Sequence, residues 1–352
     1  MDYNITELLG DGIASELSAA VRIVSAALPC KLKFEPVDLS LPSREKRGAS
    51  IYDEAVESMK RNRFSIKYPT ITSKESPNAV LRKRCDFSVI HRPVYTIPGV
   101  PTNFRQDLSL NIIRIARGGT YDDPGRPIGT EAAVSLRIVE RQPCWEAARY
   151  AFMLARRSGK TVTSASKRTI QAATDGLFAS VVNEVAHEFP DVLHQEELFD
   201  ALLAKIIMHP ERYSVILVLN EYGDFLSDMA CGLAGSMGIG ASASISFHRD
   251  GSLYLAMFDP AGGTAPDIAG KNLANPTAIF LALSMLLFEI GERGVAAALK
   301  ATVLDLLRAG VRTRDLGGDQ STMQFSERVA AALPARLSEG QGNAEAAPVD
   351  VR

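Results

Sequence analysis

Two carboxylates stand four residues apart in the segment NEYGDFLSD, at Asp224 and Asp228. The apolar run SVILVL precedes this segment and an apolar, glycine-rich stretch follows it, so we expect a strand and then a helix. Residues i and i+4 of a helix share a face, which would place both carboxylates together just beyond a strand end, where ligands bind in α/β sheets. Hard oxygen ligands suit Mg²⁺ or Mn²⁺. Taken alone, the pattern is a weak signal for a metal and is more typical of acidic residues that favour a helix N-terminus.

A second cluster combines neutral polar side chains with arginines in the segment SPNAVLRKRCDFSVIHRP. Ser76 and Asn78 lie at the start of a predicted helix, where anions bind favourably, and Arg82 lies one turn further along. Arg92 ends an apolar strand, and Arg114 interrupts the apolar run NIIRIA. Because a guanidinium can bind a carboxylate through two parallel hydrogen bonds, these arginines indicate a carboxylate site. Solvated surface is the alternative for the charged run around Arg82.

The elements that must position these side chains follow one another in the order of an α/β protein. Short apolar runs predict strands, among them SVILVLN and a strand pair that turns at Asp250-Gly251. Apolar residues at helical spacing predict helices at 50–61, 77–85, 143–159, 170–190 and 196–212, and the chain stays helical to about residue 335. The segment 336–352 lacks apolar periodicity, which predicts a disordered tail.

Composition excludes several classes of function. The 352 residues are 46% hydrophobic and 23% charged, so the chain can bury a large core. Lys and Arg (39) nearly balance Asp and Glu (41), and a net charge of −2 gives no general attraction to nucleic acid or to an anionic membrane. We therefore expect a small-molecule ligand, and neither a nucleic acid nor a membrane as partner.

The cysteines and the apolar runs bear on the compartment. Four scattered cysteines form no C-x-x-C pair, and the first residues, MDYNITELLG, do not read as a signal peptide. We expect free thiols in a reducing, cytoplasmic setting. The longest apolar run, residues 278–291, is shorter than the roughly 20 residues that cross a bilayer, so it predicts a buried helix.

Seven segments in order resemble the β-decarboxylating dehydrogenases, the family of isocitrate, 3-isopropylmalate, homoisocitrate and tartrate dehydrogenases. The resemblance covers about residues 6–335, and the last two segments are highly specific. The segments are LLGDGI (8–13), SPNAVLR (76–82), RPVYTIPGVPT (92–102), RYAFMLAR (149–156), TDGLF (174–178), NEYGDFLSD (220–228) and GTAPDIAGKNLANPTA (263–278).

The resemblance implies a two-domain α/β fold with a mixed sheet that crosses both domains. Residues 1–100 and 255–335 would form the large, cofactor-side domain. Residues 101–254 would form the small domain, which carries the metal site and the dimer contacts of a homodimer with shared active sites.

The resemblance also assigns roles to individual positions. Lys167 falls on the general base and Tyr121 on the general acid. The remaining positions fall into three groups: metal ligands Asp224, Asp228 and, from the other subunit, Asp200; substrate-binding residues Ser76, Asn78, Arg82, Arg92 and Arg114; and cofactor-binding residues Thr72, Gly263, Thr264, Ala265, Asp267, Ile268 and Asn275.

These roles imply a metal- and NAD-dependent oxidative decarboxylation of a 3-substituted (2R)-malate. Lys167 would accept the proton of the substrate hydroxyl, hydride would pass to NAD, and Tyr121 would return a proton after CO₂ leaves. Ser76 and Asn78 match the isocitrate-type pattern, whereas isopropylmalate enzymes carry apolar residues there. The polar pair favours isocitrate or an analogue with a polar or anionic 3-substituent, and a specialised pathway is compatible with it. Asp267 and Ile268 are the NAD-type pair.

The sequence departs from the family at several positions. Gly262 replaces a histidine of the adenosine loop, and the loop 69–76 is shorter than in the family. Arg114 is followed by Ile-Ala-Arg-Gly instead of Glu-Asn-Thr-Glu, so Arg117 becomes either an extra anion clamp or a solvent-facing side chain. The residues around Lys167 also differ.

Two alternatives therefore stay open. One is a tartrate- or malate-type dehydrogenase. The other is a non-catalytic regulatory or binding relative with impaired NAD binding. Retention of Lys167 and of all three predicted metal ligands favours the enzyme.

Overall fold

The computed structural model describes residues 1–104 and 106–342. Its strands are short, and those at the centre of the main sheet are mostly buried. The strands are β1 (Asp2–Leu9), β2 (Lys31–Asp38), β3 (Phe64–Lys67), β4 (Val89–Tyr95), β5 (Ser109–Ile115), β6 (Arg126–Ile128), β7 (Ala132–Val134), β8 (Val162–Ser166), β9 (His194–Leu198), β10 (Val215–Val218), β11 (Ala241–Phe247) and β12 (Leu253–Pro260).

Most of the helices bury an apolar face. The helices are α1 (Ala14–Ser25), α2 (Leu41–Arg47), α3 (Ser50–Asn62), α4 (Pro77–Arg84), α5 (Arg141–Ser158), α6 (Thr174–Ala186), α7 (Phe199–Met208), α8 (Asn220–Ala234), α9 (Thr277–Glu289), α10 (Arg293–Arg308) and α11 (Thr322–Gly342), with 3₁₀ turns at Pro210–Arg212, Met237–Ile239 and Arg314–Leu316. A few helices also bury a charged residue, as α6 and α8 do.

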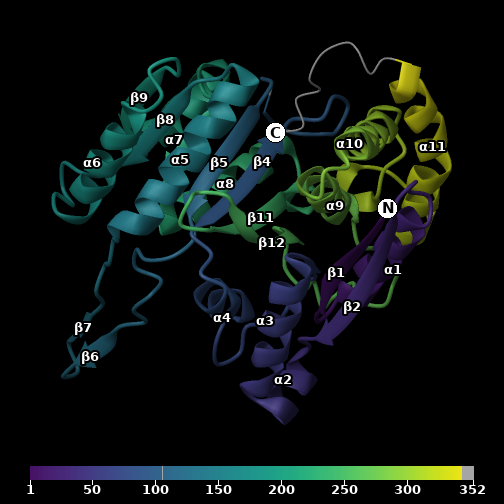
Figure 1. Ribbon diagram of the computed structural model, residues 1–352, viewed down its shortest axis with the longest axis horizontal. Coiled ribbons are helices and arrows are strands. Elements are labelled where there is room, and N and C mark those ends of the chain that lie inside the picture. The colour runs from purple at the N-terminus through teal and green to yellow at the C-terminus, as the bar shows by residue number, and fades with distance from the viewer. Residues whose placement is uncertain (105, 343–352) are drawn as a thin grey trace.

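One mixed sheet forms the framework of the described residues (Figure 1). Its ten strands lie in the order β2-β1-β3-β12-β11-β4-β5-β10-β8-β9. Parallel pairs make up both wings, and antiparallel pairing of β12 with β11, β11 with β4 and β4 with β5 joins them, so the two wings run in opposite directions. Helices cover both faces, which explains why a strand such as β10 is apolar throughout.

The wing β5-β10-β8 determines where the candidate chemistry lies. Its register aligns Arg114 with Val218 and Val218 with Ala165, near the carboxyl ends of the three strands. Lys167 follows β8, and α8 begins directly beyond β10. In the β4–β5 ladder Ile90 lies opposite Arg114, so Arg92, two residues further along, projects on the same face as Arg114.

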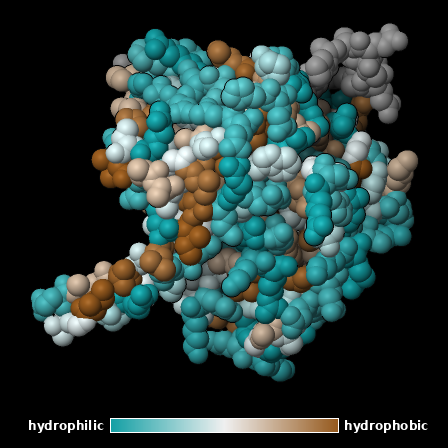
Figure 2. All heavy atoms as spheres, turned by 60° about the vertical axis from the view of Figure 1, so that its left-hand side comes forward, coloured by the Kyte–Doolittle hydropathy of each residue, from teal (hydrophilic) through white to brown (hydrophobic). Residues whose placement is uncertain are grey.

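A hairpin arm formed by β6 and β7 stands clear of the body, as Figure 2 shows. The arm exposes apolar side chains: Ile128 is 58% exposed, and Leu136 at its base is 54% exposed. Isolated monomers rarely leave such side chains in a projecting element uncovered.

The predicted pattern of strands and helices is largely confirmed, with three corrections. Residues 196–198 belong to strand β9 instead of a helix, because this segment pairs with β8 at the sheet edge. Helix α6 begins at Thr174, later than predicted, because the backbone N–H groups of Ile170 and Gln171 turn back to the carbonyl of Lys167.

The third correction concerns the predicted disordered tail. Helix α11 continues past residue 335 to Gly342, because Leu337 packs on the core and Arg336 pairs with Asp305. The remainder of the predicted tail, 343–352, lies outside the described residues. The predicted domain boundaries at about residues 100 and 255 stay a prediction.

A close approach of two chain segments fixes Gly223 in α8. A Cβ atom added there would lie 2.5 Å from Cβ of Arg114. We expect Gly223→Ala to lower the free energy of unfolding by about 1–3 kcal/mol through overpacking. Gly232→Ala, on an exposed turn of the same helix with nothing within 4 Å, is the matched control and should raise stability by about 0.5–1 kcal/mol. Urea unfolding of both variants measures the two effects, and equal values would contradict the predicted contact.

Candidate active site

Asp224 and Asp228 project from one face of α8, as their spacing predicts. The opposite face buries Leu226 and Ala230, so the carboxylates face outward. The side chain of Asp224 is 32% exposed and that of Asp228 is 54% exposed. Both groups are accessible to a ligand.

Arg114 connects β5 to the start of α8. Its side chain is only 2% exposed. The Nε–H of Arg114 donates to Oδ1 of Asn220 at 2.9 Å, and Nη1 donates to Oδ1 of Asp224. Asn220 in turn donates from Nδ2 to the carbonyl of Gly118 at 2.9 Å, which ties the segment after β5 to the same helix. Burial of one guanidinium thus organises both segments.

Arg92 reaches the same carboxylates from β4. Its Nη1 donates to Oγ of Ser227 at 2.6 Å and lies 3.4 Å from Oδ1 of Asp224 and 3.6 Å from Oδ1 of Asp228. Its Nε is buried and has no partner. An anion beside Arg92 would satisfy that donor.

Arg82 completes the cationic cluster from α4. Its Nε is also buried without a partner. Burial lowers the pKa of Arg82, and the positive charge of Arg92 lowers it further. Burial likewise lowers the pKa of Arg114 to about 9, with Arg82 and Arg92 contributing. Two buried cations, Arg92 and Arg114, and the half-buried Arg82 destabilise one another, so together they form a site that favours anionic ligands.

The two carboxylates respond differently to this environment. Burial raises the pKa of Asp224, but Arg114, Arg92 and the hydroxyl of Tyr121 outweigh it, and the pKa lies below its usual value. Burial raises the pKa of Asp228, and the charge of Asp224 adds to the effect against the opposing charge of Arg92. A divalent cation between them would favour the ionised form of both. Two hard carboxylates on one helix face therefore fit Mg²⁺ or Mn²⁺.

Tyr121 lies beside the arginines on the segment that follows β5. Its hydroxyl donates to Oδ2 of Asp224 at 3.1 Å, and its ring lies 5.7 Å from the guanidinium of Arg114. Burial raises the pKa of Tyr121, and the carboxylate of Asp224 raises it further. The phenol is therefore held protonated, as a proton donor must be.

Lys167 and Asp200 form a separate pair. Nζ of Lys167 donates to Oδ2 of Asp200 at 2.6 Å. The ammonium lowers the pKa of Asp200, which is at the surface. Within residues 1–104 and 106–342 no three acidic, histidine or cysteine side chains gather around a point, so Asp200 does not join Asp224 and Asp228 inside one chain. Within the described part of one chain, the Lys167–Asp200 pair is therefore separate from the pair of carboxylates on α8.

Ser76 and Asn78 stand at the start of α4, one turn before Arg82. Ser76 is the N-cap residue, yet its side chain makes no capping hydrogen bond, and Pro77 follows it. The Oδ1 atom of Asn78 is buried and has no partner. Both polar side chains thus remain available to a ligand of the arginine cluster.

The predicted cofactor residues gather in a different place. Thr264 packs on the turn after β1, where its carbonyl accepts the N–H of Ile13 at 3.0 Å and excludes any side chain at Gly12, whose φ is +61°. Thr72, Gly263 and Asp267 are exposed, and Ala265 and Ile268 are half-buried. An exposed carboxylate at Asp267 suits the free ribose hydroxyls of a dinucleotide.

Asn275 and Gly262 border the same loop. Nδ2 of Asn275 donates to Oδ2 of Asp315 at 2.8 Å, and Oγ of Ser236 donates to the same oxygen at 2.9 Å. A Cβ atom at Gly262 would meet only the carbonyl of Met237, at 3.9 Å. A side chain at this position would therefore meet no close neighbour at its Cβ atom.

Sequence reasoning missed two charged residues behind the arginines. Lys67 is buried at the end of β3, where Nζ donates to the carbonyl of Tyr68 at 2.9 Å, and burial lowers its pKa to about 8. Asp259 is buried near the end of β12, and burial raises its pKa against the opposing charges of Lys67 and Arg82. The signal that marked Arg114, a charged residue in an apolar strand, also marks these two.

Arg117 does not reach the cluster. Its Nη1 pairs with Asp86, so the proposed extra anion clamp is not formed in this structure.

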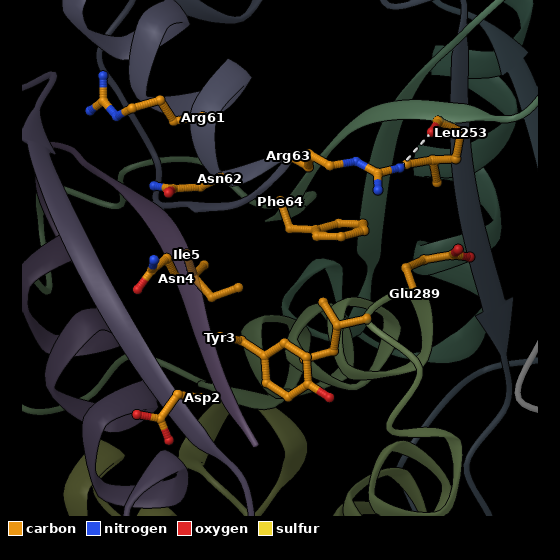
Figure 3. Close-up of a pocket in the computed structure, with 11 residues that line it drawn as sticks. Asp2, Tyr3, Asn4, Ile5, Arg61, Asn62, Arg63, Phe64, Leu253 and Glu289 are labelled. Carbon is orange, nitrogen blue, oxygen red and sulfur yellow. Dashed lines mark hydrogen bonds between the residues drawn. The ribbon is translucent and has the colours of Figure 1, made fainter.

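A cavity of about 430 Å³ lies elsewhere in the described chain (Figure 3). It opens between the first residues of β1, the start of β3 and the end of α9. Figure 3 shows that Arg63 points to Leu253, to whose carbonyl it donates at 2.8 Å. None of the predicted catalytic, substrate, cofactor or metal residues lines this cavity.

Known proteins resemble the chain over nearly its full length. Residues 4–329 match the family model described as isocitrate/isopropylmalate dehydrogenase. The isocitrate/homoisocitrate dehydrogenase of Thermus thermophilus is 35% identical over 340 residues, 95% of this chain and 99% of that protein. The NAD isocitrate dehydrogenase catalytic subunit 5 of Arabidopsis thaliana mitochondria is 32% identical over 326 residues, 91% of this chain and 86% of that protein. The crystal structure of isocitrate dehydrogenase from Methylococcus capsulatus superimposes with a TM-score of 0.87 at 31% identity, covering 94% of this chain and 99% of that one.

The contact between Asp224 and the arginines should make stability depend on pH. Asp224→Asn leaves Arg114 without its carboxylate and Arg92 with only Asp228, and because Asp224 is partly exposed we expect a loss of about 1–2 kcal/mol at neutral pH. The pKa of Asp224 is lower in the folded than in the unfolded chain. The stabilisation is therefore present above about pH 4 and is lost as the pH falls through the folded-state pKa.

Urea unfolding of the native chain and the variant at about pH 3 and about pH 7 measures this dependence. Asp319→Asn, which removes an exposed carboxylate, is the control and should change stability by less than about 0.5 kcal/mol at either pH. A loss for Asp224→Asn that is equal at both pH values would contradict the assigned pKa direction.

Proposed function

We propose that this chain, which belongs to the isocitrate/isopropylmalate dehydrogenase family, oxidises and decarboxylates a (2R)-malate that carries an anionic substituent at carbon 3. Membership of the family confirms the fold class and the oxidoreductase class predicted from the sequence. We infer the substrate and the residue roles from the geometry of the site.

The arginine cluster is the observation that carries the proposal. Arg92 and Arg114 both pair with Asp224, and Arg92 also pairs with Asp228. Arg82 lies close enough that the charges of Arg92 and Asp224 act on its pKa. The Nε–H groups of Arg82 and Arg92 are buried without an acceptor. Carboxylates of a substrate would accept from those donors in geometry that guanidinium groups favour.

Charge balance favours a trivalent substrate. The three arginines exceed Asp224 and Asp228 by one positive charge. A divalent cation together with a trivalent anion contributes one negative charge, which balances the site. A divalent malate or tartrate with the same cation would leave an excess positive charge in a largely buried place, which costs free energy. Isocitrate, or an analogue with an anionic 3-substituent, fits best.

The metal would be held by Asp224 and Asp228, with Asp200 of the partner subunit as the third carboxylate. When bound, Mg²⁺ or Mn²⁺ lowers the pKa of a substrate hydroxyl and stabilises negative charge on its oxygen. Arg92 and Arg114 hold Asp224 in place for that role.

NAD is the cofactor that the loop residues fit. Asp267 would accept hydrogen bonds from ribose hydroxyls and repel the additional phosphate of NADP. The Thr264–Gly12 contact and the tether of Asn275 to Asp315 hold this loop in a fixed shape. The open space at Gly262 removes an adenine contact, so we expect NAD to bind more weakly than it would with a histidine there.

Each active site of a dimer would combine two half-sites: Lys167 and Asp200 from one chain, and Tyr121, Asp224 and Asp228 from the other. Each half-site would carry out one proton transfer. Lys167 of the partner subunit would take the proton of the substrate hydroxyl, and Tyr121 would donate a proton to the carbon that loses CO₂. The hydroxyl of Tyr121 already lies at the metal-binding carboxylate. A homodimer with shared active sites follows, and the exposed apolar arm of β6 and β7 provides surface for the partner.

No helix in the described part of the chain is long and apolar enough to cross a membrane. The four cysteines are buried and unpaired, as predicted. A cytoplasmic location stays a prediction.

One observation favours a second candidate function. The open adenine position at Gly262, beside an intact set of arginines and carboxylates, would suit a regulatory subunit that binds the hydroxy acid without turnover. Retention of Lys167 and Tyr121 favours the dehydrogenase.

A substrate panel tests the proposed function. With NAD and Mg²⁺, we expect isocitrate to be turned over more efficiently than malate or tartrate. Asn78→Leu removes a polar group that we assign to the 3-substituent, and kcat/KM for isocitrate should fall by about 10- to 100-fold while that for malate changes by less than about threefold. Formation of NADH and of CO₂ measures both.

Lys83→Leu, on an exposed position of the same helix, is the control and should leave both substrates unaffected. Preference for malate or tartrate in the native enzyme would contradict the trivalent substrate. Absence of turnover for every member of the panel would contradict the dehydrogenase and favour the regulatory subunit that binds a hydroxy acid without turnover.

A further inference from the structure

Arg137 lies where three segments of the candidate site meet. It follows the β6–β7 arm, and its side chain is only 13% exposed although it belongs to a surface loop. Its guanidinium is shared between two buried carboxylates: Nη2 donates to Oδ1 of Asp175 at 2.9 Å, and Nη1 donates to Oε1 of Glu221. The guanidinium also lies 4.9 Å from the ring of Tyr222.

The first carboxylate leads to the predicted base. Asp175 is fully buried at the start of α6. Its Oδ2 accepts the backbone N–H of Lys167 at 2.6 Å and the hydroxyl of Tyr222 at 3.2 Å. The ring of Tyr222 stacks at 4.3 Å on Phe199, the residue before Asp200. Asp175 therefore fixes the backbone that carries the Lys167–Asp200 half-site.

The second carboxylate leads to the metal helix and to the predicted acid. Glu221 lies in the first turn of α8, three residues before Asp224. Its Oε2 has no partner and occupies the place where a Cβ atom of Gly119 would be. Gly119 pairs through both backbone groups with Ile138, the neighbour of Arg137, and Tyr121 lies two residues beyond Gly119.

We propose that Arg137 is a positioning residue that couples the two half-sites of one chain, and hence the two active sites of the dimer. The proposal rests on the proposed function, in which one chain supplies Tyr121 and Asp224 to one site and Lys167 and Asp200 to the other. Arg137 holds both sets through one guanidinium.

The physical basis is the mutual repulsion of two buried carboxylates. Without the guanidinium, Asp175 keeps only neutral donors and Glu221 loses its hydrogen-bond donor, and a buried carboxylate without a counter-ion is strongly unfavourable. Glu221 cannot move toward the loop without displacing Gly119, since there is no free space between them. When Asp175 and Glu221 move apart, Asp175 therefore shifts the backbone at Lys167, and Glu221 shifts the loop from Gly119 to Tyr121. Small displacements of this kind reduce kcat far more than they change substrate binding.

Subunit exchange tests the coupling. Arg114→Gln inactivates one half-site and Asp200→Asn the other, so mixed dimers of these two variants contain one complete site. Random exchange makes about half of the dimers mixed, which should restore about a quarter of the native activity. Arg137→Met impairs both halves, so it should restore less than about a tenth of that recovery when exchanged with either variant.

The exchange experiment tests the coupling by Arg137 separately from the shared active site. Full recovery of Arg137→Met with either Arg114→Gln or Asp200→Asn would show that Arg137 serves a single half-site and would overturn the coupling alone. Failure of Arg114→Gln and Asp200→Asn to complement each other, as native-like dimers, would overturn the shared site and the coupling with it.

Two further variants separate positioning from folding. Arg137→Lys keeps one positive charge but cannot bridge two carboxylates in the same way, and we expect kcat to fall about tenfold while KM for isocitrate and for NAD stays within about threefold. Arg141 lies four residues after Arg137 and forms an exposed pair with Glu184. Arg141→Met breaks only that pair and should leave kcat unchanged. Equal kcat in Arg137→Lys and Arg141→Met, at equal thermal stability, would contradict the positioning role.

Discussion

Burial of Arg114 is the constraint on which the site depends. A guanidinium at the end of an apolar strand must find acceptors, and it finds them in Asn220 and Asp224 at the start of α8. These hydrogen bonds hold α8 against β5 so closely that no side chain fits at Gly223. Asp228 then lies one turn beyond Asp224 on the same face of the helix. Arg92 and Arg82 then add charge beyond what the two carboxylates neutralise. The fold thus holds an excess of positive charge at one place, and a metal-bound hydroxy acid would neutralise it.

The amino-acid sequence was sufficient to locate residues that violate their local pattern. Arg92 and Arg114 stand out from apolar strands, and Asp224 and Asp228 share a helix face by spacing alone. Their convergence is a property of strand order, because the ladder of β4 and β5 brings together residues that are well separated in the chain. Arg137 carried no comparable signal, since it lies in a turn-rich loop and its two partners are 38 and 84 residues away. Strand β9 was also missed, because HQEEL has no apolar alternation and only its pairing with β8 makes it a strand.

The two sides of the site differ in how completely they are built. On the proposed substrate side, Arg92, Arg114 and Tyr121 all contact Asp224. The proposed cofactor side keeps the exposed carboxylate of Asp267 and a fixed turn at Gly12, yet Gly262 offers no side chain to a ligand. We expect substrate binding to contribute more to the assembly of the ternary complex than NAD binding does. This asymmetry fits both a dehydrogenase with weak cofactor affinity and a regulatory relative, and the retention of Lys167 and Tyr121 favours the dehydrogenase.

Calorimetric titration of the full chain with NAD, in the presence and absence of Mg²⁺ and isocitrate, tests the central claim most directly. The proposed enzyme should bind NAD when both are present and reduce it, so that heat of binding and absorbance of NADH appear in the same mixture. Binding of isocitrate with Mg²⁺ but no binding of NAD in any mixture would contradict the dehydrogenase and leave a sensor of hydroxy acids.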